Sequence, residues 1–368
     1  MIPYLEIYNW TSDKTRLQRK ALIEPSETWL EIAYYDKVEF EIYAAASASN
    51  LTALQIGNFV KIPHKPYLWL IKSIQYEYNS EGARMISAKG YEASKAILEQ
   101  RIIKYPLQLP TSLQEAITLL IDTNIGNQAE TNRQIAGFDY ELTGLEGIET
   151  EAQATRSNLW EYINNLLKEN KIGSYSILGS NNKIIFKTTK GQDKSNSIIF
   201  SQSFDNLISS TFYTSDEEEK TDCQIVSTFT SSENGVQTST DYVEYYPSES
   251  GITAGIERKE IILQSNLSTK IKNEQGEEVE ITPDSETYRN MQKAEGASLL
   301  ATKTIITNFE GEIDLANSMY EFEKDFFIGD LVGVKDEYFG FAAKARINKY
   351  TFKQDYKGYG EEAEYFTE

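Results

Sequence analysis

A short pattern near the N-terminus of this 368-residue chain returns near its C-terminus, and it constrains the fold more than any other feature. The first copy joins Glu39-Phe40-Glu41 to the turn Gly57-Asn58, and the second joins Glu321-Phe322-Glu323 to the turn Gly329-Asp330. Glycine supplies the positive φ that such turns often need, and Asn or Asp tolerates it and bonds to the local backbone. Around both turns, apolar and polar residues alternate with the period of a half-buried strand. The pattern predicts two related small β-barrels, one near each end of the chain.

A simpler explanation of the pattern stays open. The sequence Ile-Gly-[Asn/Asp]-x-Val is common in β-hairpins, so two unrelated hairpins would also contain it. A further strand-like stretch follows each copy, at residues 67–78 and 339–352, and the duplication hypothesis rests on this shared order.

Three domains are predicted, within the two to four that the length allows. Residues 1–105 alternate like strands and form the first β-barrel, which ends in a short helix at residues 91–100. Residues 106–195 form an α+β middle domain. Residues 196–368 form the second β-barrel, with a helix-containing insertion near residues 267–303. The predicted fold class is therefore α+β, mainly β.

Capping signals predict where the longer helices begin. Ser112-x-x-Glu115 is a capping box, in which side chains satisfy free amide groups in the first turn of a helix. Ser157 and Asp284 are the predicted N-caps of two later helices, the second of which covers residues 285–301. The residues predicted to face inward are Leu113, Ala116, Ile117, Leu120 and Ile121 on the first of these helices, Leu159, Ile163, Leu166 and Leu167 on the next, and Ala294, Ala297 and Ala301 on the last.

The charge of the chain argues against two classes of partner. Lys and Arg number 36 against 56 Asp and Glu, which gives a net charge of −20. Like charge repels phosphate, so nonspecific binding to nucleic acid or to an anionic membrane is disfavoured. The apolar runs are far too short to span a bilayer, so no membrane anchor is predicted. The 24 Tyr and 16 Phe residues are typical of strands and interfaces.

No catalytic, metal-binding or cofactor-binding residue is predicted, and the chain is expected not to be an enzyme. The single histidine, His64, is assigned to a surface loop, and the lone Cys223 excludes a disulfide framework and a cysteine zinc site. Asp216-Glu217-Glu218-Glu219 lacks the ligand spacing of a calcium loop. Glycine-rich phosphate-binding loops are absent. The 56 acids leave a glycosidase-type carboxylate pair open.

Nine short motifs follow one another along nearly the whole chain. They are Tyr35-Asp36-Lys37-Val38-Glu39-Phe40-Glu41, Ile56-Gly57-Asn58, Ala88-Lys89-Gly90-Tyr91, Leu98-Glu99-Gln100-Arg101, Asn158-Leu159-Trp160-Glu161, Ile199-Phe200-Ser201, Asp205-Asn206-Leu207, Gly255-Ile256-Glu257-Arg258-Lys259-Glu260, and Asp325-Phe326-Phe327-Ile328-Gly329-Asp330-Leu331-Val332. In this order they resemble phage tail hub proteins of the siphophage tail-associated lysin type, whose fold is similar to the central hub of contractile tails. Val38 departs from the glycine of the family pattern. Many members also continue past the second barrel, so this member either lacks that extension or is truncated at Glu368.

The resemblance implies a structural baseplate protein at the distal end of the phage tail in the virion, made in the host cytoplasm. It implies a homotrimer with two tube-type barrels per subunit, so that three chains present six near-equivalent surfaces to a sixfold tail ring. The implied partners are the distal tail ring protein, receptor-binding or tail-fibre proteins, and the tape-measure protein. The tip would attach to the host cell and open for DNA ejection, and DNA would pass without specific binding.

Eight residues follow from this interpretation. Glu39, Glu41, Glu321 and Glu323 are the candidate channel-lining acids, because a negative wall lets DNA slide without sticking; ordinary solvated strand faces are the alternative. Gly57, Asn58, Gly329 and Asp330 are the structural turns. Two other functions stay open: a cell-wall hydrolase of the tail tip that uses a carboxylate pair, and a carbohydrate-binding module that uses exposed aromatic residues such as Trp69.

Overall fold

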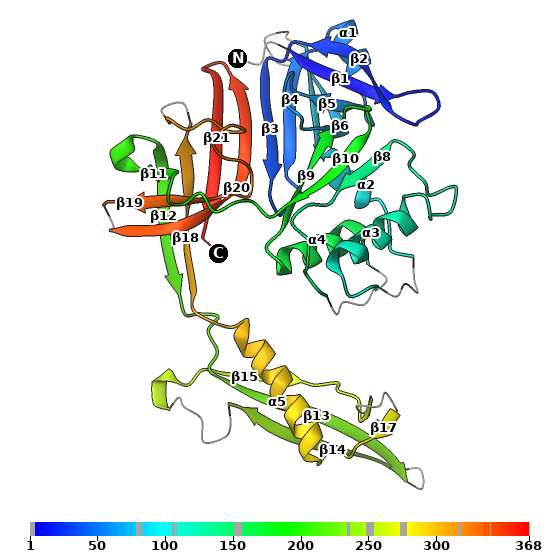
Figure 1. Cartoon of the computed structure of the whole chain (residues 1–368), viewed down its shortest axis with the longest axis vertical. Coiled ribbons are helices and arrows are strands. Elements are labelled where there is room, and N and C mark those ends of the chain that lie inside the picture. Colours follow the sequence, from blue (N-terminus) through cyan, green and yellow to red (C-terminus); the bar gives the residue numbers. More distant parts are fainter. Residues whose placement is uncertain are drawn as a thin grey trace. The chain divides into compact units, whose positions relative to one another are not determined.

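The computed structural model is mainly β, with helices packed on parts of the sheets, which confirms the predicted fold class (Figure 1). The chain divides into two units, Met1–Thr211 with Phe309–Glu368, and Phe212–Asn308. The residues that the structure describes are 4–78, 82, 84–104, 107, 109–150, 157–233, 236–247, 254–272, 278–315, 318–338 and 340–367.

One 13-stranded sheet organises most of the first unit. Across the sheet its strands follow in the order β12 (Leu207–Ser215), β18 (Ile306–Asp314), β21 (Gly358–Phe366), β20 (Phe341–Asp355), β3 (Glu27–Ala33), β4 (Glu39–Ala45), β7 (Arg84–Glu92), β6 (Trp69–Tyr78), β5 (Phe59–Lys61), β1 (Leu5–Trp10) and β2 (Leu17–Ile23). Beside this path, β19 (Leu331–Asp336) pairs with the first part of β20 and with β11 (Ile199–Ser201).

Two five-stranded modules with the same strand order lie side by side in this sheet (Figure 1). The first module is β3-β4-β7-β6-β5, and the second is β12-β18-β21-β20-β19. They are joined where the second half of β20 pairs antiparallel with β3, from Lys349 opposite Ala33 to Gln354 opposite Thr28. The two ends of the chain therefore share one topology. Closure of either module into a barrel stays a prediction.

Helices and a small sheet pack beside the first module. Helix α1 (Ala48–Ala53) precedes β5, and α2 (Ala93–Leu98) follows β7, shorter than the predicted helix at 91–100. Helices α3 (Leu113–Asn124) and α4 (Leu159–Glu169) enclose an apolar core with the sheet β8 (Phe138–Glu141), β10 (Ile184–Thr189) and β9 (Gly173–Leu178). All nine inward-facing residues predicted for α3 and α4 are buried.

The N-caps of these helices test the capping predictions. Ser112 caps α3 as predicted, because its Oγ accepts from the Glu115 amide. The prediction of Ser157 for α4 is wrong, since Asn158 is the N-cap and its Oδ1 accepts from the Trp160 amide at 3.0 Å. Serine and asparagine are both good N-caps, so the sequence favours neither of two neighbours.

The second unit is a three-stranded sheet with one long helix. The sheet order is β14 (Val236–Tyr246), β13 (Asp222–Glu233) and β15 (Glu260–Gln264), and α5 (Glu286–Ala301) contacts β13 and β14. Two short strands, β16 (Lys270–Lys272) and β17 (Glu278–Glu280), pair antiparallel with each other. Two short 3-10 helices, Gln202–Phe204 and Gly255–Glu257, complete the described elements.

Two predictions for α5 are wrong. Ser285, and not Asp284, is the N-cap, and its Oγ accepts from the Tyr288 amide at 3.3 Å. The buried face is Tyr288, Gln292 and Gly296, whereas the three predicted alanines are exposed or half-buried. The sheet provides the reason, because the Gln292 amide donates to the Ser227 hydroxyl at 3.0 Å and so finds a partner inside.

The division predicted from the sequence, with domains 1–105, 106–195 and 196–368 and an insertion near 267–303, stays a prediction. Within the third of these segments, residues 212–308 form a unit of their own. In the part of the chain that the structure describes, no helix has both the length and the apolar character needed to cross a membrane.

Candidate functional surface

The first Gly-Asn turn is fixed by backbone hydrogen bonds to its own chain and to β6. Gly57 has a φ of +87°, and the Asn58 amide donates to the Gln55 carbonyl at 3.1 Å to close the turn. The Gly57 amide then donates to the Ile71 carbonyl at 3.0 Å, and the Ile71 amide donates to the Asn58 carbonyl at 2.9 Å. A β-bulge follows Ile71 directly, between β6 and β7. The turn therefore docks on β6 just before that strand bends.

The second turn repeats every one of these contacts on β20. Gly329 also has a φ of +87°, and the Asp330 amide donates to the Phe327 carbonyl at 3.1 Å. The Gly329 amide donates to the Ile347 carbonyl at 2.8 Å, and the Ile347 amide returns to the Asp330 carbonyl at 3.0 Å. A β-bulge again follows the isoleucine. Unrelated hairpins would not share this set of bonds together with the strand order, so the two turns belong to one duplicated unit.

The side chains beside the two glycines anchor the turns by different means. The Asn58 amide group donates to the Ala53 carbonyl at 2.8 Å, at the end of α1. The buried Asp330 carboxylate accepts from the Phe327 amide at 2.9 Å and from the Gln192 amide at 2.7 Å. Lys194 lies 2.9 Å from the same carboxylate. The second turn is thus covered by the segment that leads to β11, whereas the first is held by a helix.

The acidic motif of the second copy is not where the sequence pattern predicts it. Strand registers place Glu39-Phe40-Glu41 of β4 in the same position as Glu310-Gly311-Glu312 of β18. Glu321-Phe322-Glu323 instead enters a tight turn closed by the Glu323 amide and the Phe326 carbonyl, with Glu323 at a φ of +67°. Only residues 324–327 separate this motif from Ile328, and that segment is too short for a strand and a helix such as the first copy contains.

A reciprocal exchange of large and small residues hides the true counterpart. In the first module Phe40 lies opposite Gly90, and a Cβ on Gly90 would come within 2.9 Å of the Phe40 ring. In the second module Gly311 lies opposite Tyr365, and a Cβ on Gly311 would come within 2.6 Å of the Tyr365 hydroxyl. The same core volume is filled from β4 in one module and from β21 in the other. In an alignment of the two copies, Gly311 stands at the position of Phe40, so the match is not recognised from the sequence.

One face of five neighbouring strands, β4, β3, β20, β21 and β18, carries most of their carboxylates. Residues opposite one another in paired strands lie on the same face, so the registers from β4 through β3, β20 and β21 to β18 define the side away from the buried Phe40 and Ile42. We call this side the acidic sheet face. Leaving aside the part of β20 before its bulge, where the buried Arg346 lies opposite Phe366, its charged residues are Glu27, Glu31, Glu39, Glu41, Glu310, Glu312, Asp314, Lys349, Lys353, Asp355, Glu362 and Glu364.

Ten carboxylates against two lysines leave the acidic sheet face strongly negative. Lys349 contacts Glu364 and lies 3.7 Å from Glu31, on the other side of the joint between the modules. Burial raises the pKa of Glu31, although the Lys349 ammonium opposes that rise. Exposed ion pairs contribute about 0–1 kcal/mol each. Their main effect here is therefore on the sign of the surface, which repels a polyanion.

The structure separates the four candidate channel acids into two groups. Glu39 and Glu41 lie on the acidic sheet face, where the Lys89 ammonium of β7 pairs with Glu41 at 2.9 Å. Glu321 and Glu323 lie in the turn after β18, and the Glu323 carboxylate pairs with Lys65 at 2.6 Å. Glu310 and Glu312 occupy the positions that sequence reasoning assigned to that second pair.

The residues considered for chemistry have structural surroundings. His64 is an exposed loop residue, and Cys223 is buried and free. Trp69 is fully buried, and its indole N–H donates to the Glu31 carbonyl at 2.7 Å. The expectation that Trp69 is an exposed sugar-stacking residue is therefore wrong. The start of β6 is covered on both faces, since Trp69, Leu70 and Ile71 are all buried.

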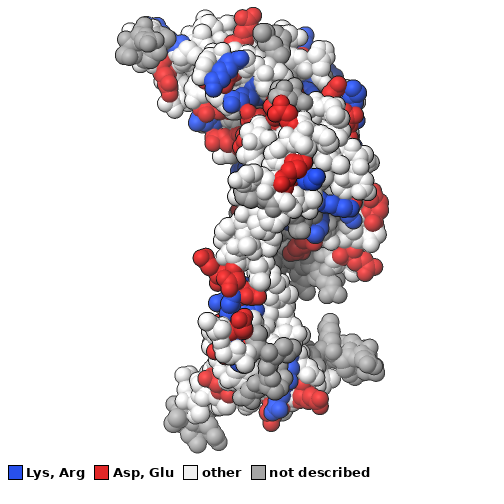
Figure 2. Space-filling view, turned by 90° about the vertical axis from the view of Figure 1, so that its left-hand side faces the viewer, with Lys and Arg blue, Asp and Glu red and all other residues white. Residues whose placement is uncertain are grey.

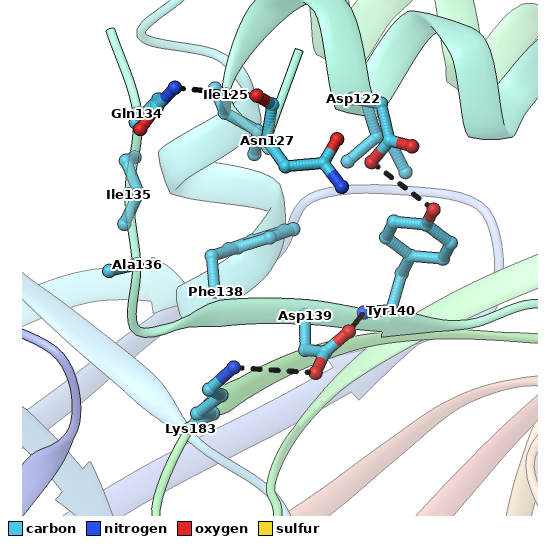
Figure 3. Close-up of a pocket in the computed structure, with 12 residues that line it drawn as sticks. Asp122, Ile125, Asn127, Gln134, Ile135, Ala136, Phe138, Asp139, Tyr140 and Lys183 are labelled. Carbon is cyan, nitrogen blue, oxygen red and sulfur yellow. Dashed lines mark hydrogen bonds and ion pairs between the residues drawn. The ribbon is translucent and has the colours of Figure 1, made fainter. Parts of the chain in front are cut away.

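A pocket of about 390 Å³ lies between the end of α3 and the β8 strand (Figure 3). Two carboxylates line it, and both are engaged. The Tyr140 hydroxyl donates to Asp122 at 3.2 Å, and Lys183 lies 3.7 Å from Asp139 (Figure 3). Burial raises the pKa of the Tyr140 phenol, and the Asp122 carboxylate adds to the rise. Both acids of this pocket are therefore held by neighbouring side chains. They do not form the free pair of carboxylates that a glycosidase uses as acid and base.

Comparison with known proteins identifies one family and several similar folds. The family model of the Siphovirus ReqiPepy6 Gp37-like protein matches residues 10–364. The search of curated proteins found no match.

Three solved structures of tail proteins share the fold at low sequence identity. The prophage MuSo2 43 kDa tail protein from Shewanella oneidensis is 12% identical, with a TM-score of 0.56 over 98% of each chain. Prophage tail protein gp18 from Listeria monocytogenes EGD-e is 14% identical, with a TM-score of 0.52 over 99% of this chain and 94% of that chain. The tail protein from Neisseria meningitidis MC58 is 11% identical, with a TM-score of 0.51 over 99% of this chain and 97% of that chain.

Proposed function

The chain belongs to the Siphovirus ReqiPepy6 Gp37-like protein family and is a phage tail protein by family and fold, and from this premise we propose that it is the hub of the tail tip. In this proposal three copies form a closed ring at the distal end of the tail in the virion. The ring connects the tail tube to the receptor-binding parts. Its role is structural, with no catalytic step.

The duplicated module is the observation that carries this proposal. Three copies of a chain with two equivalent modules contain six modules, so a threefold ring offers six similar surfaces. A sixfold tail ring protein could then dock without a change of symmetry at the contact. The matching hydrogen bonds at Gly57 and Gly329 support this equivalence at the level of single bonds. A chain with one such module would present only three surfaces.

The acidic sheet face supports a second part of the proposal, a channel through the ring. It crosses the joint between the modules, so in a ring it would continue from one module to the next. Glu39 and Glu41 of the first module, with Glu310 and Glu312 of the second, would line this channel. DNA and the tape-measure protein would leave through it, because few cationic groups are available to hold phosphate. Receptor-binding or tail-fibre proteins would attach beyond it and deliver the host contact.

A cell-wall hydrolase is not favoured by any contact in the described residues. The two carboxylates of the pocket in Figure 3 are paired with Tyr140 and Lys183, so neither is a free nucleophile or base. The buried Trp69 removes the residue that most favoured sugar binding.

Light scattering after size exclusion tests the proposal directly. The expected mass is three times that of the 41.9 kDa chain. Binding of the purified distal tail ring protein to this trimer, with six ring subunits per three chains, is the second expected result. A strict monomer at high concentration that also fails to bind the ring protein contradicts the proposal.

A further inference from the structure

A pocket of about 600 Å³ opens beside the first Gly-Asn turn. This volume lies within the range of roughly 300–1,000 Å³ that is typical of ligand sites. Its floor is apolar and buried, and consists of Phe59, Leu70 and Ile97. The loop before β8 forms one wall, and residues 134–136 of that loop also line the pocket shown in Figure 3. The pocket beside the turn thus has the size and the apolar floor of a binding site.

The second module has a chain segment at the equivalent place. Phe59 and Leu331 each stand two residues after the turn glycine, and they lie opposite Leu70 and Arg346 in the neighbouring strand. Leu70 and Arg346 are therefore counterparts. The Arg346 guanidinium is buried, and it donates to the Lys190 carbonyl at 3.1 Å. The open apolar floor of the first module thus corresponds to a covered polar contact in the second.

The chain itself passes directly over the second turn. The Leu331 amide donates to the Gln192 carbonyl at 2.9 Å, and a Cβ on Gly191 would come within 1.9 Å of the Gly329 carbonyl oxygen. At the first turn, a Cβ on Gly57 would meet no heavy atom within 4 Å. A peptide segment therefore fills in one module the position that is open in the other, and this indicates a peptide as the ligand of the pocket.

The rim of the pocket carries two basic groups, Lys14 and Arg101, and neither makes an ion pair with a described residue. A guanidinium has five N–H donors. The Arg101 Nε is buried without an acceptor among the residues that the structure describes, and the Nη1 reaches the Gln100 carbonyl at 3.4 Å. The acid of the rim, Asp13, accepts instead from the Thr15 amide at 3.2 Å. Arg101 thus has donors to spare for an acceptor from outside the chain.

Basic groups without a carboxylate partner stand out in so acidic a chain. The net charge is −20, with 36 Lys and Arg against 56 Asp and Glu. On the face drawn in Figure 2, blue basic groups lie beside red acidic ones in several places. Opposite charges attract at close range, so a cation readily finds a carboxylate of its own chain when acids are in excess. Two basic groups left together at one pocket indicate a ligand that brings its own carboxylate.

A sugar is the alternative ligand, because Trp10 also lines the pocket. A stacked sugar ring would need an exposed aromatic face. The Trp10 and Phe59 rings pack edge to face with their centroids 5.6 Å apart, and a Cβ on Gly137 would come within 2.2 Å of the indole. The indole is therefore held between neighbours as part of the apolar wall. The pocket suits an inserted side chain better than a stacked ring.

We propose that this pocket binds a peptide segment of a partner protein in which carboxylates stand directly beside a large apolar side chain. The apolar side chain fills the space over Phe59 and Leu70, where its burial is favourable. A neighbouring carboxylate accepts from the Arg101 guanidinium and pairs with the Lys14 ammonium, the charge-assisted type of contact that is strongest in proteins. The site lies within one chain, so the inference does not depend on the proposed trimer.

Titration with short peptides tests the proposal, read by NMR of the tryptophan indole N–H groups. The probe is the blocked peptide glycine–aspartate–phenylalanine–aspartate–glycine. Trp10 lines the pocket, whereas Trp29, Trp69 and Trp160 do not. The Trp10 signal, assigned with Trp10→Phe, should therefore shift while the other three stay in place. Peptides with lysine in place of both aspartates, or with alanine in place of phenylalanine, should bind at least tenfold more weakly.

Charge reversal at the rim tests the carboxylate contact. Arg101→Glu should make the lysine peptide bind more tightly than the aspartate peptide, and Lys14→Glu on the exposed turn should shift the preference in the same direction. Arg19→Glu on β2, which does not line the pocket, should leave the preference unchanged. Circular dichroism verifies the fold of each variant. Unchanged binding of the aspartate peptide by both folded rim variants overturns the proposal.

Filling the pocket tests the apolar contact. Ala136→Phe on the exposed wall should weaken binding of the aspartate peptide at least tenfold, whereas Ala342→Phe, at an exposed position of β20, should not. A Trp10 signal that stays unchanged at about 5 mM of the aspartate peptide overturns the proposal, because the affinity is then weaker than a millimolar dissociation constant. A Trp10 signal that responds to N-acetylglucosamine oligomers and to none of the peptides also overturns it and identifies a sugar site.

Discussion

Substituting alanine for Gly57 and for Gly329 separates two contributions to the free energy of unfolding. One is the backbone strain that both turns share, and the other is the packing around each turn. Gly57 and Gly329 have the same φ of +87°, so alanine meets the same backbone strain at both positions. Their surroundings differ. A Cβ on Gly57 would meet no heavy atom within 4 Å, whereas a Cβ on Gly329 would lie 2.1 Å from the Tyr34 ring. That ring is itself fully buried and held by the Thr189 carbonyl, which accepts from its hydroxyl at 2.8 Å, so it has little room to move.

These observations set the expected losses in unfolding free energy for Gly57→Ala and Gly329→Ala. Left-handed backbone costs an alanine about 1–2 kcal/mol, which is the whole expected loss for Gly57→Ala. Overpacking a closed site costs about 1–3 kcal/mol more, so Gly329→Ala should lose roughly 2–5 kcal/mol. The difference between the two variants is the contribution of packing around the second turn, because the backbone term cancels.

Urea unfolding followed by tryptophan fluorescence measures these losses in the correct part of the chain. All four tryptophans lie in the first unit, at Trp10, Trp29, Trp69 and Trp160. Gly147→Ala is a matched control, since Gly147 has a φ of +72° and also no atom within 4 Å of its Cβ, and it should lose as much as Gly57→Ala. Equal losses for Gly57→Ala and Gly329→Ala, or a larger loss for Gly57→Ala, would refute the reasoning.

Three further predictions concern charge. Lys95→Met should destabilise the first unit by about 3–5 kcal/mol in urea, because it leaves the fully buried Glu92 without the ammonium now 2.6 Å away; a loss under 1 kcal/mol contradicts this. The Lys344 ammonium and the Ser195 hydroxyl lower the pKa of Asp193 to about 2, so the stability from this contact is present at neutral pH and is lost as pH falls from about 4 toward 2. In NMR titrations, Lys344→Met should move the Asp193 midpoint upward, and an unchanged midpoint opposes the assignment. Glu39→Lys should make the trimer retain DNA at low salt and release it at higher salt, and no retention argues against a channel position.

The local parts of this fold can be predicted from the sequence because they depend on neighbouring residues. The Gly-Asn and Gly-Asp turns, the alternation of β4 and the buried stripes of α3 and α4 all follow from patterns within about ten residues. N-caps are less certain where two capping residues are adjacent, which explains why Asn158 and Ser285 replace the predicted residues.

The register of the second module depends on contacts that the sequence does not display. Glu310-Gly311-Glu312 is the counterpart of Glu39-Phe40-Glu41 only because β18 pairs with β21 as β4 pairs with β7. The aromatic residue is on β21, at Tyr365, and not on β18, so the two motifs have different residues at equivalent positions. The acidic sheet face is likewise assembled from strands near both ends of the chain, β3 and β4 on one side and β18, β20 and β21 on the other. Long-range pairing, and not local pattern, decides both.

End-on electron microscopy of the purified oligomer tests the central claim most directly, because it counts modules. The account predicts a threefold ring with six similar densities around an open or closed centre, two from each chain. A ring with only three such densities, or particles without threefold symmetry, would contradict the idea that a duplicated module lets three chains present six equivalent surfaces.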